Sequence, residues 1–179
     1  MSAKNRILDC AERLVIREGV AHLTLDAVAA DAGLSKGGIL YHFPSKDALI
    51  EGMIAHLMET AHAAIARSIE ADPEPRGRYT RAILAVNFPE PASELEQHNQ
   101  VASALLAAVV INRALLEPVK GEYRNLDASL RADGIDPVRA RIVQLAADGL
   151  WISGMLGLPG PDPALRRQLI DRLYQMTRE

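Results

Sequence analysis

The side chains best suited to chemistry in this sequence gather in residues 24–47, which read TLDAVAADAGLSKGGILYHFPSKD. Between residues 32 and 46 there are two lysines and one histidine but no acidic residue. Lysine, histidine and hydroxyl side chains donate hydrogen bonds to phosphate oxygens and base edges. The sequence contains no nucleophile elbow, phosphate-binding loop or dinucleotide-binding glycine motif. We therefore expect this segment to bind nucleic acid and expect no enzymatic activity.

Lys36 is the first candidate for a DNA contact, because it lies at the start of the second of two short predicted helices and has a long side chain that donates hydrogen bonds. Such a lysine can reach guanine O6 and N7 or a phosphate; the alternative is an ordinary solvated lysine. Gly37 and Gly38 follow it, and each costs about 1 kcal/mol in a helix relative to alanine. We interpret the two glycines as permitting close approach of the backbone to DNA, with a loosened first turn as the alternative.

Three residues at predicted helix N-termini are further candidates for phosphate contacts. Thr24 and Ser35 are suitable N-caps, and the free N–H groups of a helix N-terminus attract phosphate. Lys46 lies in the first turn of the next helix, where the helix dipole disfavours a cation. A phosphate nearby would resolve that conflict.

Two short helices must position these side chains, one beginning after Thr24 and the other running from Ser35 to about His42. Gly33 suits the tight turn between them, because glycine tolerates the left-handed backbone. This layout predicts a helix-turn-helix whose second helix enters the DNA major groove. The rest of the sequence has helical periodicity and no strand pattern. We expect an all-α protein of about nine helices, with an N-terminal three-helix domain over residues 1–46 and a second helical domain over residues 47–179.

Composition excludes several other classes of protein. With 49% hydrophobic and 24% charged residues, the chain is not disordered. Cys10 is the sole cysteine, which excludes an intramolecular disulfide and a cysteine-based zinc cluster, and the histidine spacing predicts neither metal nor cofactor. The longest apolar run, residues 101–111, falls short of the roughly 20 residues that span a bilayer. We expect a cytoplasmic protein without membrane contact.

The net charge of −3 first argues against a nucleic-acid binder. However, residues 1–50 contain six basic and six acidic residues, whereas residues 51–179 contain 14 and 17. The acidic excess therefore belongs to the second domain. We expect weak non-specific DNA affinity and a modest salt dependence, because few lysines contribute.

Residues 5–52 resemble the TetR family of bacterial transcriptional regulators. The resemblance rests on Thr24, Val28-Ala29, Ala32-Gly33, Leu34-Ser35-Lys36-Gly37, Tyr41-His42-Phe43-Pro44-Ser45-Lys46 and Leu49. It implies an N-terminal DNA-binding domain and a divergent helical domain that binds an effector and forms a homodimer.

The resemblance also implies that Tyr41 and His42 contact phosphates. The alternatives are an edge-of-core aromatic ring for Tyr41 and an interhelix hydrogen bond for His42. Gly38 and Leu40 depart from the family pattern, which commonly has threonine and tyrosine at these positions. Two expected DNA contacts are therefore missing. We expect Phe43 and Leu49 to lie in the core.

In the second domain, a few large or polar residues interrupt otherwise aliphatic helices. As candidates for the lining of an effector site we take Met58, His62, Phe88, Asn112, Trp151 and Met155. Ordinary core or interface positions are the alternative for each. The candidates for the dimer interface are on the last two helices: Leu150, Gly154, Leu158, Leu165, Leu169, Ile170 and Leu173. Burial within the monomer is the alternative.

These expectations combine into a homodimeric repressor that leaves a pseudo-palindromic operator in double-stranded DNA when a small, largely apolar effector binds. The alternative function is a helical small-molecule-binding or structural dimer without specific DNA binding, which the departures at Gly38 and Leu40 motivate.

Overall fold

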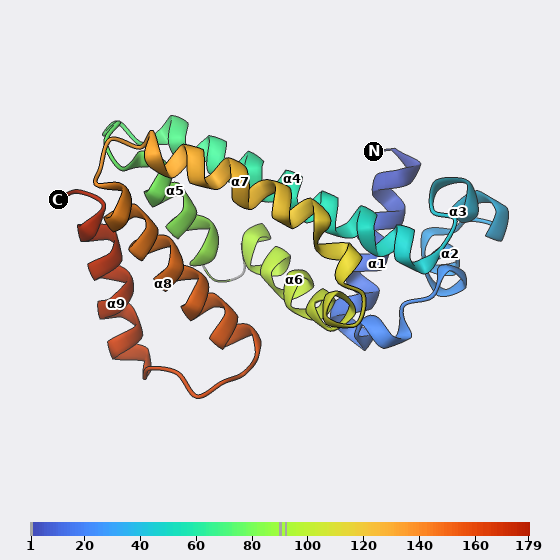
Figure 1. Ribbon diagram of the computed structural model, residues 1–179. Helices are drawn as coiled ribbons and strands as arrows, with labels where there is room; N and C mark the ends of the chain where they lie inside the picture. The colour runs from blue at the N-terminus through green and yellow to red at the C-terminus, as the bar shows by residue number, and fades with distance from the viewer. Residues whose placement is uncertain (1, 90, 92) are drawn as a thin grey trace. The chain divides into compact units, whose positions relative to one another are not determined.

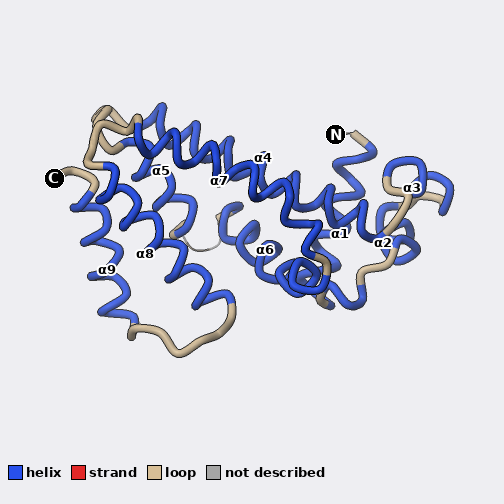
Figure 2. Tube along the Cα trace, in the orientation of Figure 1, coloured by secondary structure: helices blue, strands red, loops and turns tan. Residues whose placement is uncertain are grey.

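The computed structural model of the protein describes residues 2–89, 91 and 93–179. Within them it contains nine α-helices and no strand (Figures 1 and 2), as the sequence predicts. The helices are α1 (Ala3–Glu18), α2 (Leu25–Ala32), α3 (Lys36–His42), α4 (Lys46–Ala71), α5 (Arg78–Asn87), α6 (Glu94–Ile111), α7 (Glu117–Arg131), α8 (Pro137–Met155) and α9 (Pro163–Met176). Short 3₁₀ turns occur at Val20–His22 and Arg113–Leu116.

The chain forms two compact units. The first comprises Met1–Thr60 and Gln97–Val119, and the second comprises Ala61–Glu96 and Lys120–Glu179. This division follows packing, whereas the predicted division at residues 46 and 47 follows function. The latter stays a prediction.

The core of the first unit is mainly aliphatic and anchors α1 and the two short helices α2 and α3. The buried face of α1 contains five residues at helical spacing, Ile7, Leu8, Ala11, Leu14 and Val15. Val28 of α2 and Ile39 of α3 are fully buried in the same core. Phe43 and Leu49 also lie there, which confirms their prediction as core residues. The two short helices are thus held by one inward-facing side each.

The second unit combines two small aliphatic clusters with a buried arginine. Ile83 packs with Leu130 in one cluster, and Leu84 packs with Val143 in the other. Arg81 of α5 is 4% exposed, and its Nε donates to Asp72 Oδ2 at 2.6 Å. Its remaining nitrogens donate to the carbonyls of Glu74, Arg76 and Thr177. One cation therefore joins the α4–α5 connection to the end of α9.

Candidate nucleic-acid interface

The turn between α2 and α3 has the geometry of a helix-turn-helix. Gly33 adopts the left-handed conformation with φ 65°, and Leu34 N–H donates to the Ala29 carbonyl at 2.9 Å. Ser35 caps α3 by accepting from Gly38 N–H at 3.1 Å. Thr24 caps α2 in the same way through Ala27 N–H, also at 3.1 Å. Both predicted N-caps are confirmed, and their phosphate contacts stay predictions.

One side of α3 is anchored and the other faces solvent. Ile39 is buried, and Phe43 directly after the helix is 3% exposed. Lys36, Gly37, Leu40 and Tyr41 are exposed. The anchored side leaves the polar side free for a groove of DNA, which is the arrangement that major-groove reading requires.

The fold itself does not require glycine at positions 37 and 38. A Cβ atom at Gly37 would lie 4.0 Å from Ser35 Oγ, and one at Gly38 would lie 3.4 Å from the same atom. Both distances are ordinary van der Waals contacts, and neither glycine has a left-handed backbone. Internal packing therefore does not account for the two glycines, and both interpretations stay open: close approach of DNA to the backbone, and a loosened first turn of α3.

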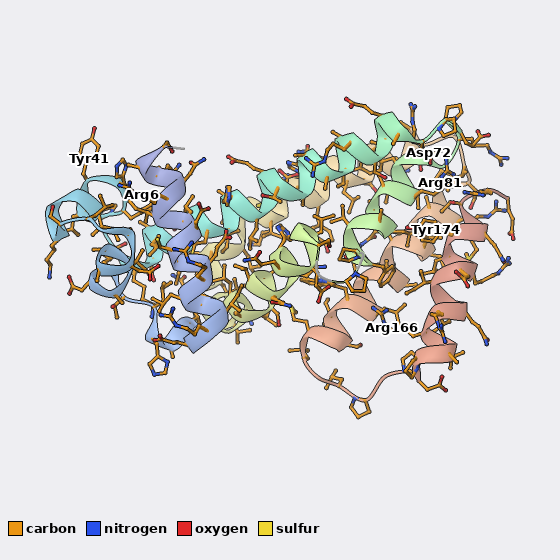
Figure 3. All side chains as sticks on the ribbon, turned by 180° about the vertical axis from the view of Figure 1, so that it is seen from behind. Arg6, Tyr41, Asp72, Arg81, Arg166 and Tyr174 are labelled. Atoms are coloured by element: carbon orange, nitrogen blue, oxygen red, sulfur yellow. The ribbon has the colours of Figure 1, made fainter. Side chains whose placement is uncertain are left out.

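Tyr41 extends away from α3 and is 85% exposed (Figure 3). It is therefore not an edge-of-core aromatic ring, the alternative that the sequence left open. Its ring meets that of His42 edge to face, with centroids 5.1 Å apart. A tyrosine hydroxyl presented in this way is free to donate to a phosphate.

Lys46 has a partner that the sequence did not indicate. Its Nζ donates to the Val20 carbonyl at 2.9 Å and lies 3.5 Å from the Ala21 carbonyl. These carbonyls belong to the 3₁₀ turn after α1. The hydrogen bonds to them compensate for the unfavourable position of the lysine in the first turn of α4, so a phosphate is not needed for this. Its contact with DNA stays a prediction, now with a structural role beside it.

Lys36 also has a protein partner. Its Nζ lies 3.3 Å from Oδ1 and 3.4 Å from Oδ2 of Asp26, in the first turn of α2. Both side chains are 70% exposed. Because the pair is so exposed, the alternative of an ordinary solvated lysine stays open, and the DNA contact of Lys36 stays a prediction.

The six candidate effector residues are divided between the two units. Met58 packs against the core of the first unit, and Asn112 caps a 3₁₀ turn and donates to Asp47 at 3.3 Å. In the second unit, His62 Nε2 lies 2.6 Å from Glu122 Oε2, and Phe88 packs beneath Arg166 at 5.3 Å. Trp151 and Met155 are half-buried on α8. Their role in effector binding stays a prediction.

The seven candidate dimer residues fall into two groups. Leu173 is 7% exposed within the aliphatic cluster of α5 and α8, and Leu150 packs against the same cluster. Leu173 therefore matches the alternative, burial within the monomer, whereas Leu150 is half-buried. Ile170 is half-buried, and the other four are exposed: Gly154, Leu158, Leu165 and Leu169.

The sequence reading missed a different apolar stripe on α8. Val138, Ile142, Leu145, Ile152 and Leu156 are all at least 42% exposed, and the exposed Gly149 lies between them. The spacing alternates between four and three residues, which places all six positions along one side of the helix. That spacing was present in the sequence, but periodicity alone did not show which side of α8 faces inward.

A polar network between α7 and α8 was also missed. Tyr123 Oη donates to Asp148 Oδ2 at 2.9 Å, and Gln144 donates to the same oxygen. Burial, together with the Asp148 charge and hydrogen bond, raises the pKa of Tyr123 to about 12. Burial also raises the pKa of Asp148 above its ordinary value. Isolated polar residues in separate helices gave no signal of this pairing.

Taken together, the fold and this site define a helix-turn-helix DNA-binding protein. Residues 7–53 match the family model described as bacterial regulatory proteins, tetR family. Residues 77–178 match the model of the tetracyclin repressor-like C-terminal domain. The chain belongs to the TetR family and is a transcriptional regulator.

Individual relatives agree with this assignment. The chain is 31% identical over 159 residues to the transcriptional regulator BetI of Burkholderia thailandensis, covering 84% of this chain and 80% of BetI. It is similar to a TetR-family member from Streptomyces coelicolor A3, with TM-score 0.69, 26% identity and coverage of 97% and 98%. It is also similar to the multidrug binding protein EbrR complexed with ethidium, with TM-score 0.65, 27% identity and coverage of 96% and 98%.

Within the described residues, no group of three or more histidine, cysteine, aspartate or glutamate side chains could hold a metal ion. In the same part of the chain, no helix is long and apolar enough to cross a bilayer.

Proposed function

We propose that this protein is a homodimeric repressor in the bacterial cytoplasm that leaves a pseudo-palindromic operator when a small, largely apolar effector binds. The observation that carries the proposal is the free side of α3, where an exposed lysine and tyrosine flank two glycines that the fold does not need. In this proposal each protomer places α3 in one major groove of the operator.

Phosphate contacts hold the helix in place. The N-termini of α2 and α3, capped by Thr24 and Ser35, offer their first N–H groups to the DNA backbone. Tyr41 and His42 donate to phosphates at the other end of α3. Lys36 is the side chain of this set suited to base acceptors in the groove.

The dimer proposal rests on the apolar stripe of α8, Val138, Ile142, Leu145, Ile152 and Leu156. A row of exposed aliphatic side chains along a helix is unusual on a monomer and marks a protein-protein contact. Leu165 and Leu169 of α9, in the same unit, are also exposed, and we include them in the proposed dimer surface. A twofold axis through this face pairs the two copies and sets the separation of their α3 helices.

Relief of repression requires that the effector bind the conformation that does not fit DNA more tightly than the one that does. The similar protein EbrR is complexed with ethidium in its crystal structure. A ligand of comparable size suits the half-buried aromatic and thioether side chains of Trp151 and Met155.

The test begins with DNA. Duplexes selected by the protein from a random-sequence pool are expected to share a pseudo-palindrome, and Lys36→Ala is expected to weaken binding to them by about tenfold or more. Lys4→Ala, an exposed lysine of α1, serves as a control for loss of one positive charge. Selection that yields no shared sequence would contradict the proposal and favour a helical dimer without specific DNA binding.

A further inference from the structure

The ion pair between Lys36 and Asp26 joins the first turns of the two helices that form the reading head. Lys36 Nζ is nearly equidistant from the two carboxylate oxygens of Asp26, at 3.3 Å from Oδ1 and 3.4 Å from Oδ2. Asp26 is the acidic residue in the first turn of α2, directly after the N-cap Thr24 and Leu25. A carboxylate is thus held at a surface that the proposed function assigns to phosphates.

This position has two electrostatic consequences. The pair carries no net charge, so Lys36 in the free protein offers a passing phosphate little attraction. A phosphate that takes Lys36 from Asp26 leaves a carboxylate beside an anion. Because non-specific binding to DNA comes almost entirely from phosphate neutralisation, the pair lowers that kind of binding in particular.

Base recognition is affected differently. An exposed ion pair is weak, so neutral acceptors such as guanine O6 and N7 can recruit the lysine without placing a second anion beside Asp26. The penalty is therefore smaller at the correct sequence than at an arbitrary one. Discrimination of this kind, by a cost against the wrong partner, is a general source of specificity.

We propose that Asp26 is a specificity-determining residue, which restrains Lys36 until base acceptors in the groove replace the carboxylate. The inference rests on the proposed DNA-binding function. Asp26 acts through Lys36 and is a positioning residue. The other reason for an acid here is the helix dipole, which favours a negative charge in the first turn. That effect stabilises α2 whether or not Lys36 is present.

A double-mutant cycle separates the two roles. The proteins are wild type, Asp26→Asn, Lys36→Gln and the double variant. Each is titrated, at several salt concentrations, with a duplex selected from a random pool and with a scrambled duplex of equal composition. Asp26→Asn is expected to tighten binding to scrambled DNA by about threefold, to change binding to selected DNA less, and to raise the salt slope on scrambled DNA by about one. In the Lys36→Gln background, Asp26→Asn is expected to change the affinity for the two duplexes by the same factor.

Asp47→Asn is the matched control, because Asp47 is also an exposed acid in the first turn of a helix, α4. Asp47→Asn is expected to change the affinity for both duplexes by the same factor, in the wild-type background and in the Lys36→Gln background. Circular dichroism of every variant checks that the fold is retained. Equal tightening on both duplexes by Asp26→Asn, or the same effect without Lys36, would overturn the role of Asp26 while leaving the proposed function intact. Failure of wild-type protein to prefer any selected duplex would overturn both.

Discussion

Gly52 and Phe43 are in such close contact that a Cβ atom added to Gly52 would lie 2.5 Å from Cε1 of the phenylalanine ring. Gly52 lies within α4, and Phe43 is the C-cap of α3. The missing side chain lets the ring pack directly on the α4 backbone. This contact fixes the end of α3 to the long helix that follows it.

Gly52→Ala is therefore expected to destabilise the protein although alanine favours helices. Overpacking costs about 1–3 kcal/mol, against about 1 kcal/mol gained in helix propensity. We expect a net loss, measured as the free energy of unfolding in urea. With Phe43→Leu, whose side chain lacks the clashing ring atoms, the same change to alanine is expected to stabilise. Additive effects of the two substitutions would contradict the packing explanation.

Gly37→Ala and Gly38→Ala are each expected to raise the stability of the protein and to weaken its binding to DNA. Each has room for a methyl group, so each substitution is expected to raise stability by up to about 1 kcal/mol. The same methyl group is expected to weaken operator binding by keeping the backbone away from DNA. Unfolding in urea and a gel shift on selected DNA measure the two effects. Unchanged affinity in both variants would favour a loosened first turn as the reason for these glycines.

Lys46→Met is expected to reduce stability as well as DNA affinity. The ammonium group donates to the Val20 carbonyl, and loss of such a bond costs about 1 kcal/mol. Thermal unfolding of the free protein measures this contribution without DNA. An unchanged melting temperature would mean that Lys46 does not stabilise the fold and would leave DNA contact as its only proposed role. Arg17→Met, an exposed basic residue paired with its neighbour Glu18, is the control and is expected to have a smaller effect.

The Asp72–Arg81 ion pair (Figure 3) predicts a pH-dependent contribution to stability. The hydrogen bond from Arg81 holds the pKa of Asp72 below its ordinary value. A carboxyl with a lowered folded-state pKa stabilises fully above the unfolded pKa of about 4 and loses that effect as pH falls through the folded-state pKa. Asp72→Asn is expected to cost about 2 kcal/mol at pH 7 and much less at about pH 2. Urea denaturation at both values measures this. Asp171→Asn, an exposed acid on α9, is the control, and a cost independent of pH would contradict the ionic explanation.

The apolar stripe of α8 predicts the oligomeric state of two variants. Ile142→Glu and Leu145→Glu place charges on the proposed dimer surface and are expected to give monomers, because a buried unpaired carboxylate costs several kcal/mol. Size-exclusion chromatography with light scattering measures the mass. Val110→Glu, the same kind of change at an exposed position of α6, is expected to remain dimeric. If both α8 variants remain dimeric, the dimer interface does not include this side of α8.

Local features of the fold were predictable from the sequence. The α1 face, the caps Thr24 and Ser35 and the turn at Gly33 depend on neighbours within about four residues, so spacing and residue type identify them. The same local signals predicted the helix-turn-helix and about nine helices. The resemblance of residues 5–52 to the TetR family depends on them as well.

Only the tertiary structure decided which partners meet across longer separations. Lys46 reaches a carbonyl 26 residues away, and Lys36 pairs with Asp26, ten residues before it. On α8, packing against α5 and α9 turned Leu150 inward and left Ile142 and Leu145 outside. A helix rich in aliphatic residues has more than one apolar side, and periodicity does not rank them. The neighbouring helices make that choice by burying one side and leaving the other exposed to solvent.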